Sequence, residues 1–197
     1  MTNILVIGSK PKSTIPKIKV HKVYTANGSA ELGKKYRQYY PKTMLICLAG
    51  KREFEKNFRV KNRIIKANPK RLYIRMGKID LPNKLKKTKL EYKSKKFQIL
   101  FQSKFFNFGI FTLILSEFFW GRNLYQKIKH IARIIKHNTL QGVSTGFYSI
   151  LLALHENPDS KIIISGIGMQ GGVQFYKSQR SKVYEYSPRA RVDRFMM

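Results

Sequence analysis

The sequence predicts an α/β domain with a mainly parallel sheet and helices on both of its faces. Short apolar runs that end at turn residues are typical of buried strands, and five of them occur along the chain. Helical patterns separate most of these runs, which favours parallel strands joined by crossover helices. The chain has 197 residues, so we expect one domain over residues 1–197 that is large enough to bury a core.

The expected strands are apolar segments that stop at a turn. Residues 3–8 end in glycine, residues 20–26 end before an Asn-Gly pair, and residues 44–48 form the run MLICL. Residues 71–76 are a fourth candidate, and residues 161–166 form the run KIIISG.

The expected helices lie between these strands. Ser29 is placed to cap a helix that runs to residue 39, and Pro41 prevents the helix from continuing. Residues 51–68 carry apolar side chains three, four or seven positions apart, which is the spacing of one helical face. Residues 124–136 are expected to form a basic amphipathic helix, and an apolar helix over residues 147–155 ends before an Asn-Pro pair.

Residues 84–137 are expected to form a basic helical insertion, or a lid. Seven lysines and one acid lie between Lys84 and Lys96, which is interpreted either as a solvated loop or as a docking surface for phosphates or anionic lipid. Residues 105–120 are strongly apolar but shorter than the roughly 20 residues of a membrane span. They fit a buried helix or strand-plus-helix of the core, or an interfacial element, and a true span is the third alternative. Exposed apolar surface there would favour a homo-oligomer.

Charge dominates the composition, with 40 Lys and Arg against 10 Asp and Glu and a net charge of +30. We therefore expect an anionic partner or substrate, and composition leaves nucleic acid, anionic lipid and nucleotide sugars open. The single cysteine, Cys47, excludes a disulfide-stapled scaffold. The histidines lack neighbouring carboxylate ligands, so no metal is expected. The N-terminal run has no basic leader, which predicts a cytoplasmic protein. The apolar run 105–120 and the lysines leave open a peripheral position at the inner membrane.

The candidate binding site lies where the strands end, since ligands of parallel sheets bind beyond the carboxyl ends of the strands. The segment Gly8-Ser9-Lys10-Pro11 follows the first strand, Asn27-Gly28-Ser29 the second, and residues 167–172 the last. The run Ser144-Thr145-Gly146 precedes a helix whose free N–H groups suit a phosphate or a carboxylate. Together these features favour nucleotide binding, although neither a P-loop motif nor G-x-G-x-x-G occurs.

Four short segments resemble the bacterial sialyltransferases of glycosyltransferase family 42. Residues 144–148 (STGFY), with the apolar helix after them, and residues 164–167 (ISGI) are similar to the core of that family. Residues 7–11 (IGSKP) resemble its first-strand nucleotide loop, and residues 23–27 (VYTAN) resemble its second strand with an asparagine.

The resemblance implies a Rossmann-like domain that transfers sialic acid from a CMP-linked donor, with inversion and without a cofactor or catalytic metal. The acceptor would be a surface glycan or lipopolysaccharide. Asn27 would lie near the transferring sugar, residues 144–146 would hold the sugar carboxylate or the phosphate, and residues 166–168 would line the cytidine pocket. Tyr176 is the expected catalytic residue, which stabilises the departing phosphate. The substrate-binding residues so implied are Gly8, Ser9, Asn27, Ser144, Thr145, Gly146, Gly166, Ile167, Gly168 and Gln170.

The chain departs from the family pattern at several positions. Ser9 replaces an asparagine of the family, Gly142 replaces an arginine, and Gly168 replaces an acidic residue. The family's catalytic histidine precedes an aspartate, and spacing from Asp193 puts Pro188 there, while a looser match puts Arg191 there. Neither side chain accepts a proton at neutral pH. The chain ends shortly after Asp193, where the family usually continues, so we expect truncation or degeneration.

Three interpretations stay open on the sequence. The first is an active sialyltransferase-like transferase, and the second is a catalytically inactive remnant of that family. The third is a basic nucleic-acid-binding protein, in which cations contact phosphates and aromatic side chains stack on bases. The aromatic residues considered for that stacking are Tyr36, Tyr39, Tyr40 and Phe58.

Overall fold

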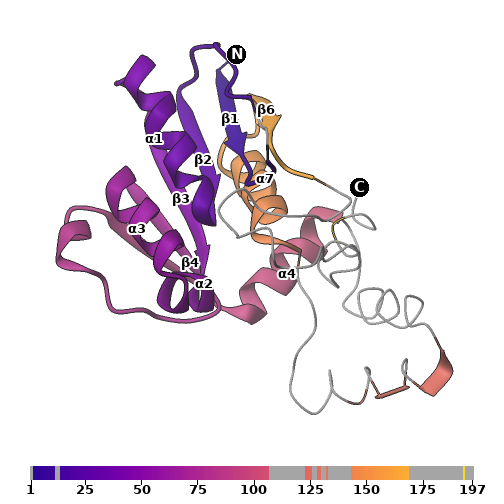
Figure 1. Cartoon of the computed structure of the whole chain (residues 1–197). Coiled ribbons are helices and arrows are strands. Elements are labelled where there is room, and N and C mark those ends of the chain that lie inside the picture. The colour runs from indigo at the N-terminus through magenta and orange to yellow at the C-terminus, as the bar shows by residue number, and fades with distance from the viewer. Residues whose placement is uncertain are drawn as a thin grey trace.

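The computed structural model describes residues 2–11, 14–106, 123–125, 128–129, 132, 143–168 and 193. Within them, six strands form one sheet in the order β5-β4-β3-β2-β1-β6, and every neighbouring pair is parallel (Figure 1). The predicted Rossmann-like α/β fold class is therefore confirmed. The strands are β1 (Asn3–Ile7), β2 (Lys22–Ala26), β3 (Met44–Gly50), β4 (Arg71–Arg75), β5 (Lys89–Lys93) and β6 (Lys161–Ser165).

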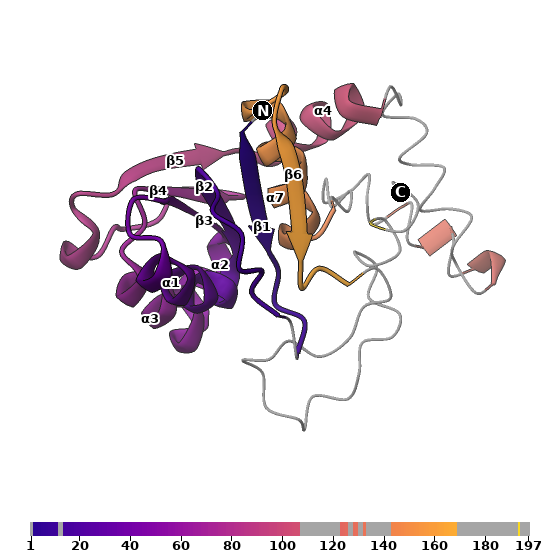
Figure 2. The same ribbon diagram turned by 90° about the horizontal axis from the view of Figure 1, so that it is seen from above.

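Helices cover both faces of this sheet. Three of them, α1, α2 and α3, lie on one face, and α4 and α7 lie on the other (Figure 2). Two short 3-10 helices, η1 and η2, follow β2 and β4. The bounds are η1 (Asn27–Ser29), α1 (Ala30–Tyr39), α2 (Lys51–Lys56), α3 (Phe58–Ala67), η2 (Asn83–Leu85), α4 (Lys95–Phe106) and α7 (Thr145–Glu156).

The central strand β1 shows how the sheet divides the core. Successive side chains of a strand point to opposite faces. Ile4 and Val6 therefore pack with apolar side chains of α7, whereas Leu5 and Ile7 pack with side chains of α1 and α3. All four are almost completely buried. A strand covered on both faces needs apolar residues at every position, which is why β1 appears in the sequence as a continuous apolar run.

The C-terminal end of α7 is attached to the sheet by a polar cluster around Glu156. Its carboxylate accepts a hydrogen bond from the Tyr24 hydroxyl at 2.6 Å and another from the Tyr73 hydroxyl. Arg71 lies 3.4 Å from the same carboxylate. Burial, followed by the hydrogen bond to Glu156, raises the pKa of both tyrosines above the ordinary value of 10.0. This cluster sets the position of α7 across the sheet.

The lysine-rich segment after residue 84 differs from the expected loop. Lys89–Lys93 form β5, which pairs in parallel with β4 and is the edge strand of the described sheet. Glu91 lies 3.6 Å from Lys89 and 3.7 Å from Lys93, so its carboxylate offsets the two flanking charges. An edge strand has one neighbour and tolerates charged side chains, and lysine there discourages pairing with another chain. The expectation of a solvated loop is therefore wrong for these five residues.

The helical segment over residues 51–68 is divided at Asn57. The Asn57 side chain accepts a hydrogen bond from the Val60 N–H at 3.3 Å and so begins α3, while α2 ends one residue earlier. Phe54 and Ile64 are buried on the expected face, but Phe58 is 74% exposed. The apolar spacing therefore predicted the buried face correctly except at the first residue of α3.

Two expected elements lie largely outside the described residues, namely the helix over 124–136 and the apolar run 105–120. Among the helices that the structure describes, none has both the length and the apolarity needed to cross a bilayer.

Candidate functional site

The candidate site is the carboxyl edge of the sheet around β1. The strand order runs from β1 through β2, β3 and β4 to β5 on one side, whereas β6 lies on the other side of β1. The direction in which the chain adds strands therefore reverses between β1 and β6. Loops that leave neighbouring strands in opposite directions open a crevice at such a point, which is where ligands of open α/β sheets bind.

The loops after β1 and β6 run against each other. The Gly8 N–H donates to the Ser165 carbonyl at 2.7 Å, and the Lys10 N–H donates to the Gly166 carbonyl at 2.9 Å. A Cβ at position 8 would overlap the Gly166 carbonyl and the Ile167 side chain, so this close approach requires glycine. Gly166 itself has a φ of +68°, which also favours glycine. The structure thus brings Gly8 against Gly166 and Ile167, which are far from it in the sequence.

The end of β2 is joined to the end of β1 by hydroxyl groups. The Ser9 hydroxyl donates to the Ala26 carbonyl at 3.1 Å. The Ser29 hydroxyl accepts from the Ala26 N–H at 2.8 Å and donates to the Ile7 carbonyl at 2.7 Å. Ser29 was expected to cap α1 with its side chain, but it makes no such bond and instead connects the two strand ends. Ser9 and Ser29 therefore fix the loop after β1 and the loop after β2 relative to each other.

Asn27 is one of the residues at this edge whose hydrogen bonding is incomplete in the described part of the chain. It follows β2 directly, adopts a left-handed φ of +53°, and is 8% exposed. Its Oδ1 atom is buried and has no hydrogen-bond partner in the described part of the chain. A buried carbonyl oxygen without a partner costs about 1–3 kcal/mol. Asparagine tolerates the left-handed conformation better than most residues, which explains the residue type at this position. The buried oxygen without a partner is the feature that suits a ligand-binding position.

The N-terminus of α7 lies at the same edge because α7 runs antiparallel to the strands that flank it in sequence. Ser144 caps the helix, since its hydroxyl accepts from the Phe147 N–H at 3.1 Å. Gly146 lies against Ile167, so the first turn of α7 contacts the loop after β6. The N–H groups of Thr145 and Gly146 have no protein acceptor within the described residues. They are available to an anion.

Arg75 holds the N-terminus of α7 in place through hydrogen bonds from inside the domain. It is the last residue of β4 and is 2% exposed. Its guanidinium donates to Gln98 Oε1 at 2.7 Å, to Thr145 Oγ1 at 3.2 Å and to the Val143 carbonyl at 2.9 Å. It also lies over the Tyr148 ring, 4.6 Å from the centroid. Burial raises the pKa of the Tyr148 hydroxyl to about 12, against the opposing effect of Arg75. One buried cation therefore joins β4, α4 and α7.

Asp193 holds the same peptide unit from its other side. Its side chain is 3% exposed and accepts from the Ser144 N–H at 2.7 Å, while the adjoining Val143 carbonyl accepts from Arg75. A carboxylate at a helix N-terminus is favourably placed in the field of the helix. Asp193 therefore positions α7 and occupies one donor of its N-terminus.

The expected site residues separate into three groups in the structure. Gly8, Gly146, Gly166 and Ile167 are in close approach, and Gly168 continues that loop. Ser9, Ser144 and Thr145 direct their hydroxyls to protein partners, whereas Asn27 retains an orphaned oxygen. Gln170 and Tyr176 lie outside the described residues.

Two residues of this edge, Arg75 and Gln98, are not indicated by the sequence. Arg75 ends an expected strand, and a charged residue at that position gives no signal of burial by itself. Gln98 lies on α4, inside the segment that was expected to be an insertion. Within the described ranges no three His, Cys, Asp or Glu side chains lie close enough together to hold a metal ion.

Comparison of the chain with protein-family models, with curated proteins and with solved structures finds no match.

Proposed function

We propose that the chain is a glycosyltransferase that binds a nucleotide sugar, with CMP as the nucleotide, at the carboxyl edge of β1, β2 and β6. The observation that carries the proposal is the orphaned Oδ1 of Asn27, buried at a strand end in a left-handed conformation. A sugar hydroxyl or a cytosine amino group would donate to this oxygen. Binding would then supply the hydrogen bond that Asn27 Oδ1 lacks within the described residues, and that raises affinity.

The N-terminus of α7 supports the anionic part of such a ligand. The N–H groups of Thr145 and Gly146 point out of the helix, and the helix dipole favours negative charge there. Arg75 lies behind them, and although its guanidinium is used internally, its positive charge still acts on a group bound at the helix. The net charge of +30 would further concentrate an anionic donor around the chain.

In the proposed reaction an acceptor hydroxyl attacks the anomeric carbon of the donor. The new bond joins the acceptor oxygen to that carbon, the bond to the phosphate oxygen breaks, and CMP leaves with the bonding electrons. The proton of the acceptor hydroxyl passes to a base. We expect solvent or another group of the acceptor to be that base, since neither Pro188 nor Arg191 can accept a proton. Donors directed at the departing phosphate would stabilise its growing charge, and Tyr176 is proposed for this role with the α7 N–H groups.

Nucleotide discrimination in a thermal-shift experiment tests the binding step. CMP, UMP, GMP, AMP and a short DNA duplex are compared at low and moderate salt. At about 100 times its Kd, CMP should raise Tm by about 5–10 °C, and the shift should survive added salt. Stabilisation by DNA alone that disappears with salt would contradict the proposal and support nucleic-acid binding. Equal shifts from all four nucleotides would exclude a cytidine pocket.

A matched pair of variants tests the residue that carries the proposal. Asn27→Gly keeps the left-handed backbone and removes the amide, and we expect it to abolish the CMP shift. Asn68→Gly is the control, because Asn68 also has a positive φ, of +44°, but it lies at the amino edge after α3. If both variants retain the CMP shift, Asn27 does not contact the nucleotide.

A transfer assay with a CMP-linked donor tests the chemistry. Tyr176→Phe should slow transfer and leave CMP affinity nearly unchanged. An unchanged rate would remove Tyr176 from the role of stabilising the phosphate. CMP binding without transfer to any glycan acceptor would contradict the enzyme assignment and favour the inactive remnant.

A further inference from the structure

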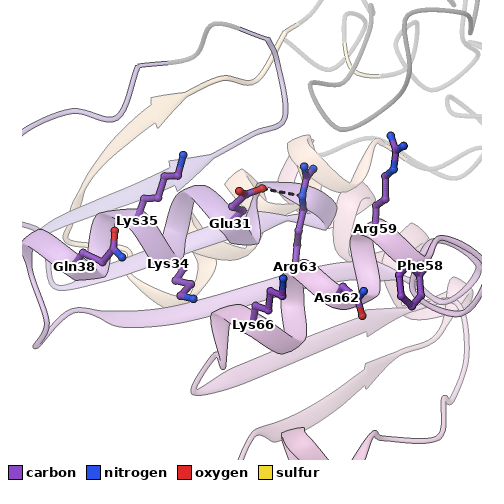
Figure 3. A pocket seen from close by; sticks show the side chains of 9 residues that line it. All are labelled: Glu31, Lys34, Lys35, Gln38, Phe58, Arg59, Asn62, Arg63 and Lys66. Carbon is purple, nitrogen blue, oxygen red and sulfur yellow. Dashed lines mark ion pairs between the residues drawn. The ribbon is translucent and has the colours of Figure 1, made fainter.

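A second feature lies on the outer side of the helix layer, away from the candidate site. A groove of about 450 Å³ runs between α1 and α3, whose buried residues face the sheet while the groove residues face outward (Figure 3). Neighbouring helices in a compact domain usually fill such space with apolar side chains. The groove is lined by Glu31, Lys34, Lys35, Gln38, Phe58, Arg59, Asn62, Arg63 and Lys66.

Cations are concentrated in this groove well beyond their frequency in the chain. Five of its nine lining residues are Lys or Arg, compared with 40 of 197 residues overall. Its single carboxylate, Glu31, is engaged by Arg63 at 2.8 Å. Lys34 and Lys66 extend toward the space between the helices, and in the described part of the chain neither these lysines nor Lys35 has an ion-pair partner (Figure 3). Like charges at such spacing repel one another, so the groove favours an anionic occupant.

The size of the groove argues against a nucleic-acid strand as that occupant. Each of the two helices has ten residues and is about 15 Å long. That length covers two or three nucleotides, whereas single-strand-binding folds use about 4–16 nucleotides per domain. Base stacking also needs successive aromatic platforms, and the lining holds one aromatic side chain, Phe58.

The position of Phe58 fits a bilayer surface. It is 74% exposed at the start of α3, directly before Arg59. An exposed aromatic ring beside cations is the arrangement by which peripheral proteins place a ring at the headgroup boundary and lysines on lipid phosphates. A volume of about 450 Å³ falls in the range of small-ligand sites and accommodates a lipid headgroup.

We propose that the α1–α3 groove docks the chain on an anionic bilayer by binding the headgroup phosphates of its lipids. Lys34, Lys35 and Lys66 supply the unpartnered charges, and Phe58 enters the interface. Since α3 begins at the carboxyl edge of the sheet, docking would bring that edge close to the membrane surface. The proposal does not depend on nucleotide binding and is tested without nucleotide.

Vesicle sedimentation with the full chain tests it. Vesicles of phosphatidylcholine with about 30% phosphatidylglycerol are compared with pure phosphatidylcholine at low and high salt. The test variant is Lys34→Gln/Lys66→Gln. The control, Lys104→Gln/Lys161→Gln, removes the same charge from exposed positions on α4 and β6. We expect the test variant to lower the partition coefficient about 30-fold, or fivefold per lysine, and the control to change it less than threefold.

Each outcome decides the proposal. Selective loss in the groove variant, with binding that weakens at high salt, supports it. Equal loss in the two variants would overturn it, because diffuse charge would then account for attraction to the membrane. Tight binding to single-stranded DNA that the groove variant loses, with no vesicle binding, would also overturn it and assign the groove to nucleic acid. Both variants replace exposed lysines, so circular dichroism and Tm should match the wild type.

Discussion

The orphaned oxygen of Asn27 leads to a prediction about stability as well as binding. Asn27→Gly removes a buried acceptor that has no hydrogen-bond partner among the described residues, which relieves about 1–3 kcal/mol. Glycine also adopts the left-handed φ of +53° without strain, but it increases the entropy of the unfolded chain at a cost of about 0.5–1 kcal/mol. The net expectation is that the variant is more stable than the wild type.

The control variant isolates the contribution of the oxygen. Asn68→Gly changes the same residue type at a similar φ, but Asn68 is exposed, so no buried acceptor is relieved. The entropy cost of glycine is common to both variants, so we expect the free energy of unfolding of Asn27→Gly to exceed that of Asn68→Gly by about 1–3 kcal/mol. For a chain of this length the difference corresponds to about 2–12 °C in Tm.

Urea unfolding followed by circular dichroism, without ligand, measures both variants. The reasoning is refuted if Asn27→Gly is less stable than Asn68→Gly, since Oδ1 would then be satisfied in the free protein. A gain in stability together with loss of the CMP shift would show that a ligand-binding position is retained at the expense of stability, as expected where function requires an unsatisfied group.

Three further predictions concern the residues that hold the edge together. Gly8→Ala should destabilise the chain by about 1–3 kcal/mol because a Cβ would overlap the loop after β6, whereas Gly50→Ala, with no atom within 4 Å of its Cβ position, should be neutral in the same urea titration. Arg75→Met should cost about 3–5 kcal/mol, because it leaves the groups that Arg75 binds without a partner, and a loss below about 1 kcal/mol would show that α7 is held elsewhere. Because burial raises the pKa of Tyr24 and Tyr73 above that in the unfolded chain, their contribution to stability is complete below about pH 10 and is lost as pH rises further. Tyr24→Phe should therefore flatten the fall in unfolding free energy above that pH, and an identical fall in wild type and variant would exclude Tyr24 as a source.

The strands show how far local pattern alone identifies the fold. β1, β3 and β6 are short apolar runs with glycine at or near their ends, and their positions follow from that pattern. β5 could not be identified in this way, because an edge strand with one neighbour needs little apolar surface. The division between α2 and α3 follows from one side-chain bond at Asn57, which a spacing of apolar residues does not report.

At the candidate site, the sequence indicates which residues lie at the edge but not which of their groups the protein itself binds. Gly8, Asn27 and Ser144 were identified because each follows a strand or precedes a helix, where ligands bind in this fold class. The sequence did not indicate that the Ser9 and Thr145 hydroxyls are used by the protein itself. Hydrogen-bond partners distant in sequence depend on packing, and no local pattern encodes them.

Local patterns and composition are enough to predict the fold class, the ends of β1, β2 and β6, and the excess of positive charge. Packing of the sheet and its helices decides which loops meet and that Arg75 and Asp193 hold one peptide unit at the start of α7 from opposite sides. It also leaves the Asn27 Oδ1 atom without a partner among the residues that the structure describes. It also decided that cations spread along α1 and α3 form one groove. These features depend on distances between residues far apart in the chain, which are set when the sheet and its helices pack.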